Sequence, residues 1–396
     1  MDWMYLVYFL LGGVLFAGAR FCRRGEWNED YTSLGQTKVL LGFTALCIAL
    51  HHLGQKSCGP WHPRSFIVHG LDFFVPLGYL FVAVFLFCSG MGLYKSLKTK
   101  PNYLRGFVKR RIMPIVIAYY LSSVLYLIAR AGMGEKMDSL TMLWYLSGLH
   151  MSNNSAWYVV VIPFFYLVFY LAFRFCRREG AAIGLVFLFT LIYTALSAFV
   201  DHQDDWWICG EWWYNSIIMF PLGLLFARHE RAVTAAFKKG YWLWLALAVA
   251  GMIASYRFAD LAANSLWGYY GETFNDPLKV VHRLGSAASQ WLVCVFYTAL
   301  CFLIMLKARF GNAVLVWLGG VTLEFYLVHT LFVEMFGFNF MEVAKSVVYI
   351  RNVPLFILAV LACSVPATLL FRFLWKCLCR LLLRNRRRAA EPEAEV

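Results

Sequence analysis

Hydrophobic residues occur along most of the chain in long runs, and short polar segments separate one run from the next. A run of about 17 to 25 apolar residues is long enough to cross roughly 30 Å of hydrocarbon as an α-helix. The pattern predicts an all-α protein, a polytopic transmembrane bundle of about eleven helices. The predicted spans cover residues 3–19, 37–54, 71–94, 112–129, 156–173, 182–200, 213–227, 241–256, 285–306, 313–336 and 353–376.

The composition excludes a soluble globular domain. The chain is 61% hydrophobic and only 15% charged, and a soluble domain of this kind would expose large apolar patches and aggregate. The formal charge of +14 comes mainly from basic residues between alternate spans. It is a topology signal, and nucleic-acid binding is not needed to explain it.

The basic residues predict the orientation of the helices. Most of the 36 Lys and Arg residues follow the odd-numbered spans, which places the N-terminus outside and the C-terminus in the cytoplasm. Basic residues follow the first span but do not precede it, as in an uncleaved anchor. We expect an N-terminal anchor helix with a basic loop (1–34), a membrane domain (35–380) and a basic cytoplasmic tail (381–396).

Two adjacent histidines, His51 and His52, close the second span near its outer end. By residue count, His329 reaches a similar depth in the tenth span, and Glu324 lies in the same span. Ionisable groups in a membrane are functional candidates by default. The alternatives are a histidine that only bonds a neighbouring helix and a neutral Glu324 bonded to a backbone carbonyl.

Other polar segments carry weaker signals. The basic stretch 95–111 is either an orientation signal or a site for an anionic ligand, and the aromatic, acidic loops 201–213 and 258–284 suit either sugar binding or an interfacial belt. Cys58 and Cys209 fall in outer loops and form a candidate disulfide. The cysteines lack metal-ligand spacing, so we expect no metal site.

Five motifs occur in the order typical of one family. They are a first core helix with Gly42 and His52, a Phe-Phe-x-x-Ser-Gly-like Phe85–Gly90, a basic Phe107–Pro114, a Trp157-Tyr158 pair, and a Leu-Gly…Tyr-Leu-x-His-like Leu318–His329. Over residues 35–375 the chain resembles the acyltransferase 3 family of bacterial integral-membrane acyltransferases. The resemblance implies a ten-helix core preceded by one additional N-terminal helix.

Three positions depart from the family pattern. Leu41 stands where a basic residue precedes Gly42, and Lys38, one turn earlier, is the nearest replacement. Of the two spaced arginines in the cytoplasmic motif only Arg111 aligns well, and Thr322 replaces a serine. The chain is therefore expected to be a divergent member.

The resemblance implies an O-acyltransferase that moves an acyl group, usually acetyl, from cytoplasmic acyl-CoA to a hydroxyl of an extracytoplasmic glycan. A histidine near the outer leaflet would act as general base. His52 is the better candidate because it keeps the family's spacing from Gly42, and His51 stays open because helical neighbours point about 100° apart. The candidate residues fall into three groups: His51, His52, Glu324 and His329 for catalysis; Ser89, Arg105, Lys109, Arg110 and Arg111 for the acyl donor; Trp157, Tyr158 and Tyr326 for the acceptor.

We expect a multi-pass protein of the bacterial inner or plasma membrane whose partners are the bilayer and the glycan. The runner-up class is a transporter or exporter of a glycolipid or small polar solute, which predicts broken helices and an internal repeat. A membrane sensor or scaffold is the third class, and it needs none of the histidines. The sequence predicts no oligomeric state.

Overall fold

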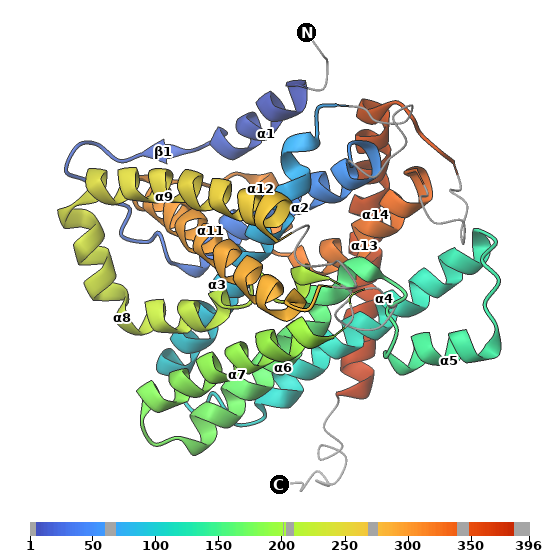
Figure 1. Cartoon of the computed structure of the whole chain (residues 1–396), viewed down its shortest axis with the longest axis horizontal. Coiled ribbons are helices and arrows are strands. Elements are labelled where there is room, and N and C mark those ends of the chain that lie inside the picture. The colour runs from blue at the N-terminus through green and yellow to red at the C-terminus, as the bar shows by residue number, and fades with distance from the viewer. Residues whose placement is uncertain are drawn as a thin grey trace, which may run out of the picture.

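The computed structural model describes residues 5–59, 69–200, 202, 210–267, 276–338 and 348–383. Within these residues the chain is almost entirely helical (Figure 1). The strands are one short antiparallel pair, β1 (Arg20–Phe21) with β2 (Ala308–Arg309). The all-α class predicted from the hydrophobic runs is confirmed.

The helices follow one another through short connections. The first half of the chain contains α1 (Leu6–Phe16), α2 (Leu34–Ser57), η3 (Asp72–Leu77), α3 (Gly78–Thr99), η4 (Val108–Ile112), α4 (Met113–Gly132), α5 (Ser139–Ser147), η5 (Asn154–Ala156), α6 (Trp157–Phe175) and α7 (Glu179–Phe199). The second half contains η6 (Glu211–Trp213), α8 (Met219–Lys239), α9 (Tyr241–Leu261), η7 (Ala262–Leu266), α11 (Lys279–Lys307), α12 (Ala313–Gly319), α13 (Thr322–Phe336) and α14 (Val353–Leu382).

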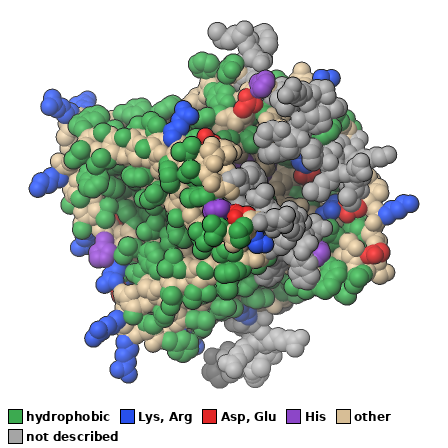
Figure 2. Space-filling view, in the orientation of Figure 1, with side chains coloured by type: hydrophobic (Ala, Val, Ile, Leu, Met, Phe, Trp, Pro, Cys, Tyr) green, Lys and Arg blue, Asp and Glu red, His purple; other side chains and the backbone are tan. Residues whose placement is uncertain are grey.

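Eight helical segments in the described parts of the chain are long and apolar enough to cross a membrane, and a ninth forms if the bent pair α12–α13 counts as one span. The bend between α12 and α13 is 92°. Many large apolar side chains on these helices are exposed, and they cover a broad face in Figure 2. Such a surface suits hydrocarbon, so the protein is a multi-pass membrane protein.

Two of the eleven expected spans do not meet this test. Helix α1 has 11 residues, which gives about 16 Å and covers only half of a bilayer core. Helix α8 begins at Met219, is kinked at His229, and continues into a charged second half with Arg231 and Lys238. The charged residues of this second half make α8 amphipathic. They lie beyond residues 213–227, the range of the predicted span, so the hydropathy of that range did not reflect them.

Close backbone contacts hold the central helices together. A β-carbon added to Gly319 of α12 would lie 2.0 Å from the Lys38 carbonyl oxygen of α2, and one added to Gly42 would lie 2.3 Å from the Leu315 carbonyl oxygen. Small residues let helices approach this closely within a membrane. The α2–α12 contact brings α13, which follows α12 after the bend, against the second half of α2.

The two ends of the bundle differ. One end, called here the histidine end, carries the last turns of α2 and the first turns of α3, α6 and α11. The opposite, basic end carries the connections from α3 to α4 and from α6 to α7. In Figure 2 Lys and Arg side chains gather at the left and lower-left edges, beside β1, the α8–α9 turn and the α6–α7 turn.

Candidate active site

The core of the site is a pair of imidazoles from two helices that are distant in sequence. Nδ1 of His52 on α2 lies 2.8 Å from Nε2 of His329 on α13. His329 is fully buried, and His52 is half-buried. The predicted equal depth of these two histidines is confirmed, because their rings are in direct contact.

The hydrogen-bond network assigns the proton positions of a neutral pair. Nδ1 of His329 lies 2.8 Å from the Phe325 carbonyl oxygen, and only an N–H can bond to a carbonyl, so this nitrogen carries the proton. Nε2 of His329 is then an acceptor, and it receives the Nδ1–H of His52. Consequently Nε2 of His52 holds an unshared electron pair and can accept a proton.

His51 lies in a different environment from its neighbour. Its Nδ1 donates to the Phe74 carbonyl oxygen at 3.0 Å, and its ring packs on the start of α3, where a β-carbon added to Gly78 would lie 2.5 Å from His51 Nε2. Successive helical side chains point about 100° apart. The structure therefore pairs His52, and not His51, with His329.

The three aromatic residues expected to bind an acceptor form a chain of ring contacts that begins at the pair. The Tyr326 ring lies 6.5 Å from His52 and 6.0 Å from the Tyr158 ring, and Trp157 lies 6.3 Å from Tyr158. The Tyr326 hydroxyl donates to the Ser155 carbonyl oxygen just before α6. This bond brings the start of α6 to the level of the histidines, as the sequence predicted.

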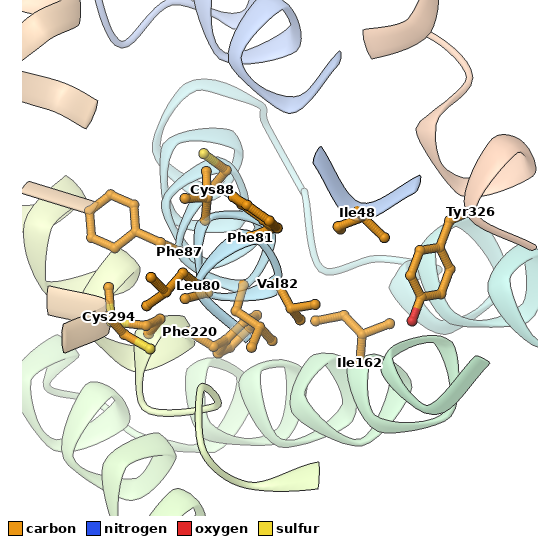
Figure 3. Close-up of a cluster of buried hydrophobic side chains, with 14 of the residues drawn as sticks. Ile48, Leu80, Phe81, Val82, Phe87, Cys88, Ile162, Phe220, Cys294 and Tyr326 are labelled. Atoms are coloured by element: carbon orange, nitrogen blue, oxygen red, sulfur yellow. The ribbon is translucent and has the colours of Figure 1, made fainter. Parts of the chain in front are cut away.

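A cavity of about 180 Å³ extends from Tyr326 into the bundle. Figure 3 shows Ile48, Val82 and Ile162 around this region, with the Tyr326 ring reaching towards α6. On α6 the lining residues Tyr158 and Tyr166 are eight positions apart, about 12 Å along the helix. The remaining lining residues are Phe85, Ile115, Thr322 and Leu323.

The cavity lies between the level of the histidine pair and the level of Ser89. His52 follows Ile48 by one turn of α2 and so lies beyond one end of the cavity. At the other end the Tyr166 hydroxyl lies 2.7 Å from Ser89 Oγ of α3. Thr322, which stands at the family's serine position, also lines the cavity and keeps a hydroxyl there.

The predicted donor-binding cations lie at the basic end, and Arg105, Lys109, Arg110 and Arg111 are all exposed. Helix α4 has proline near its first position, and a proline in a helix cannot donate to the carbonyl four residues earlier. The preceding turn η4 is accordingly π-helical, with the Met113 N–H bonded to the Val108 carbonyl. π-Helical turns are rare in proteins as a whole, but those that occur are often found at functional sites.

Ring contacts connect the basic segment to the cavity. Arg110 donates to the Tyr103 carbonyl oxygen at 2.9 Å, and the Arg111 guanidinium lies 5.8 Å from the Tyr103 ring. Tyr103 contacts Phe107 at 5.7 Å, and Phe107 contacts Tyr166 at 6.2 Å. The basic segment therefore meets the bundle beside Tyr166, which lines the cavity and bonds to Ser89.

Glu324 is placed differently from the other catalytic candidates. It is 4% exposed in the first turn of α13, where a carboxylate favours the helix N-terminus. Its Oε1 lies 3.6 Å from Nε of Arg372 on α14. Both nitrogens of His329 bond to other groups, so Glu324 does not orient that imidazole.

Sequence reasoning missed three parts of the site. Arg372 was missed because it lies on the next helix, 48 residues after Glu324. Tyr166 was missed because no motif marks it, although its spacing of eight from Tyr158 was an available signal. The Phe325 carbonyl that sets the His329 tautomer carries no sequence signal. Lys38 is exposed, so it does not bring a charge into the cavity in place of Leu41.

Two further expectations concern cysteines and metals. Cys58 is buried, but Cys209 lies outside the described residues, so their pairing stays a prediction. Within the described ranges no group of three or more His, Cys, Asp or Glu side chains is arranged to hold a metal ion.

Fold and site together define a polytopic helical membrane protein with a histidine pair at one end of an internal cavity. A family model, the acyltransferase domain of the acyltransferase 3 family, matches residues 39–373. The chain belongs to this family, and membership supports a membrane acyltransferase. Comparison with the curated proteins and with the solved structures finds no match.

Proposed function

We propose that the protein transfers an acyl group, acetyl in the first instance, from cytoplasmic acyl-CoA to a hydroxyl of an extracytoplasmic glycan in the bacterial cell membrane. The observation that carries this proposal is the cavity between the His52–His329 pair and the Ser89–Tyr166 pair. A thioester carbonyl delivered through it from the basic end would meet an acceptor hydroxyl at the histidine end.

His52 acts as the general base in this proposal. Its Nε2 takes the proton of the acceptor hydroxyl while the oxygen attacks the thioester carbonyl carbon. The carbon–sulfur bond then breaks, the new ester bond remains, and the proton passes from His52 to the leaving thiolate. His329 accepts the Nδ1–H of His52 throughout and stabilises the imidazolium that forms.

The aromatic residues hold the acceptor. A sugar ring can pack its C–H face on Tyr326 or Tyr158, while the Tyr326 hydroxyl keeps its bond to Ser155. Trp157 and Tyr158 remain as donors for the carbonyl oxygen that becomes negative during the reaction. His329 is not assigned this role, because its single N–H bonds to Phe325.

The basic segment holds the donor. Coenzyme A carries several phosphate charges, and guanidinium groups bind phosphates with two parallel hydrogen bonds. Arg105, Lys109, Arg110 and Arg111 are exposed, so they can meet a ligand from the cytoplasm without moving. The pantetheine arm would then pass Tyr166 and Ser89 into the cavity.

A transporter is the second candidate, and the 92° break between α12 and α13 is a feature that this class uses. One experiment separates the two. Protein in lipid vesicles receives radiolabelled acetyl-CoA on one side and envelope glycan on the other. We expect label in an alkali-labile ester on the glycan; glycan flux without esterification would favour the transporter and refute the proposal.

A further inference from the structure

A second group of polar side chains is buried at the histidine end, away from the imidazoles. It lies where the outermost turns of α11 meet the end of α7 and the segment after η6; α7 and α11 are in contact (Figure 1). We call it the polar layer. Its members, all between 0% and 3% exposed, are Trp213, Asn215, Ser216, Arg283, Ser286 and Gln290.

Three members of the polar layer share one face of α11. Arg283, Ser286 and Gln290 follow each other by three and four positions, which aligns them along the helix. In a membrane helix such a stripe turns inward, because polar groups are costly against hydrocarbon. The stripe begins one turn from the start of α11 and so opens towards the histidine end.

The frame around these side chains is held by hydrogen bonds. Nη1 of Arg283 donates to the carbonyl oxygens of Ala198 at 3.0 Å and Val200 at 2.9 Å. The Trp291 indole N–H donates to the Tyr214 carbonyl oxygen at 3.0 Å. These bonds fix the end of α7 and the segment after η6 against α11.

The polar tips, in contrast, have no hydrogen-bond partner among the described residues. The unpartnered atoms are Trp213 Nε1, Asn215 Oδ1, Ser216 Oγ, Arg283 Nε, Ser286 Oγ and Gln290 Oε1. Buried polar atoms in folded proteins are almost always bonded to protein, water or ligand. These six atoms belong to one face of α11 and to the segment that packs on that helix, and their number indicates that something polar occupies the layer.

The chemistry of the tips describes the occupant. The indole and guanidinium nitrogens only donate, the two amide oxygens only accept, and the serine hydroxyls do both. A lipid chain would satisfy none of them. A polyhydroxylated ligand donates and accepts at several points, as a sugar does; ordered water is the simpler occupant.

A chain of aromatic ring contacts favours a sugar over ordered water as the occupant. The Trp213 ring lies 6.2 Å from Trp157, which lies 6.3 Å from Tyr158, and Tyr158 leads through Tyr326 to His52. Water needs no stacking surface, whereas sugar rings pack on aromatic faces. This chain of aromatic rings therefore connects the polar layer to the proposed acceptor site.

We propose that the polar layer is a second acceptor subsite, which holds a sugar unit of the glycan remote from the reacting hydroxyl. The inference rests on the proposed function, because it takes the acceptor at His52 to be a glycan. Trp213 gives the stacking face, while Asn215, Ser286, Gln290 and Arg283 bond the hydroxyls. The protein would thus prefer oligosaccharides to single sugars.

The test uses the full-length protein in lipid nanodiscs. Envelope glycan of the host cell is cut by mild acid and separated by size into monosaccharides and short oligosaccharides. Binding is measured without donor by saturation-transfer NMR, and turnover is measured with labelled acetyl-CoA. The variants are Ser286→Ala and Gln290→Leu, with Thr298→Val as the control.

Thr298 is a matched control because it lies on α11 two turns beyond Gln290, is 2% exposed and also has an unpartnered hydroxyl. It lies instead at an apolar groove with Phe226 and Phe302. Ser286→Ala removes a single oxygen, so it keeps the test valid if Gln290→Leu does not fold.

We expect Ser286→Ala and Gln290→Leu to weaken oligosaccharide binding and raise the oligosaccharide KM by about tenfold, with the acetyl-CoA KM unchanged. Monosaccharides should respond little, and Thr298→Val should match the wild type. Unchanged oligosaccharide binding in both variants would overturn the subsite and leave water as the occupant. Oligosaccharide binding in a wild type without acyl transfer would instead refute the proposed reaction and leave the subsite in place.

Discussion

The histidine end and the basic end of the bundle are built in opposite ways. At the histidine end, His52 and His329 are held by two hydrogen bonds, one between the rings and one to the Phe325 carbonyl oxygen, and His329 is fully buried. At the basic end, Arg105, Lys109 and Arg111 are exposed. One end restricts the geometry of a few atoms, and the other presents charge to solvent.

This difference determines which function each end can support. Proton transfer needs a group within about 3 Å and in one tautomer, which buried hydrogen bonds provide. Capture of a charged ligand needs only a local excess of opposite charge, which acts over several ångströms. Substitutions at the histidine end should therefore change kcat, whereas substitutions at the basic end should change the KM of the donor.

The largest expected effect is the loss of the base. His52→Ala should lower kcat by about 10²- to 10⁴-fold and leave the acyl-CoA KM nearly unchanged, because the donor phosphates bind at the basic end. Steady-state turnover with labelled acetyl-CoA measures both values. Gln substituted for Lys56, one turn further along α2, is the control and should retain activity; an active His52→Ala protein would exclude His52 as base.

The next effect tests His329 as a positioning residue. His329→Ala removes the acceptor of the His52 Nδ1–H, a bond to a group that becomes charged, worth about 1.5–3 kcal/mol or roughly 10- to 100-fold in kcat. His329→Gln keeps an acceptor near the Nε2 position and should recover part of the rate. Equal kcat values for His329→Ala and His329→Gln would mean that His329 only fills space. The control is Thr330→Val, and a loss of kcat there as large as in His329→Ala would lead to the same conclusion.

Much of the histidine end could be predicted from sequence because helices convert residue counts into depth. Counting along the second and tenth spans placed His52 and His329 at one level, and the structure puts them 2.8 Å apart. The spacing from Gly42 favoured His52, but the sequence alone could not exclude His51. The choice depends on how His51 packs on Gly78, a contact between helices that neither sequence segment encodes alone.

The features that the sequence did not predict depend on the length of individual helices and on packing between them. Hydropathy predicted the helical class, but it gave full spans where α1 has only 11 residues and α8 is kinked. The tenth span contains no Lys or Arg, and the basic partner of Glu324 is Arg372 on the neighbouring α14. Pairs between helices follow from packing, whereas composition and periodicity describe one helix at a time.

At the basic end we expect an effect on affinity. Arg111→Gln removes one charge-assisted contact with the donor phosphates and should raise the acyl-CoA KM by about tenfold, with kcat nearly unchanged. The wild-type KM should also rise with salt, since exposed charges are screened. Lys239→Gln, a basic change at the α8–α9 turn, is the control; an equal KM increase there would mean that general surface charge, and not this segment, attracts the donor.

The smallest effect is expected between the two ends, where the cavity passes Ser89. Ser89→Ala removes a neutral hydrogen bond to Tyr166, worth about 0.5–1.5 kcal/mol, and should lower kcat/KM for acetyl-CoA by roughly 2- to 10-fold. Tyr166→Phe removes the same bond from the other side. If the bond itself guides the donor, the double variant should lose no more than either single variant. Additive losses would show that each hydroxyl contacts the donor separately, and the cavity would then bind the thioester arm through two independent groups.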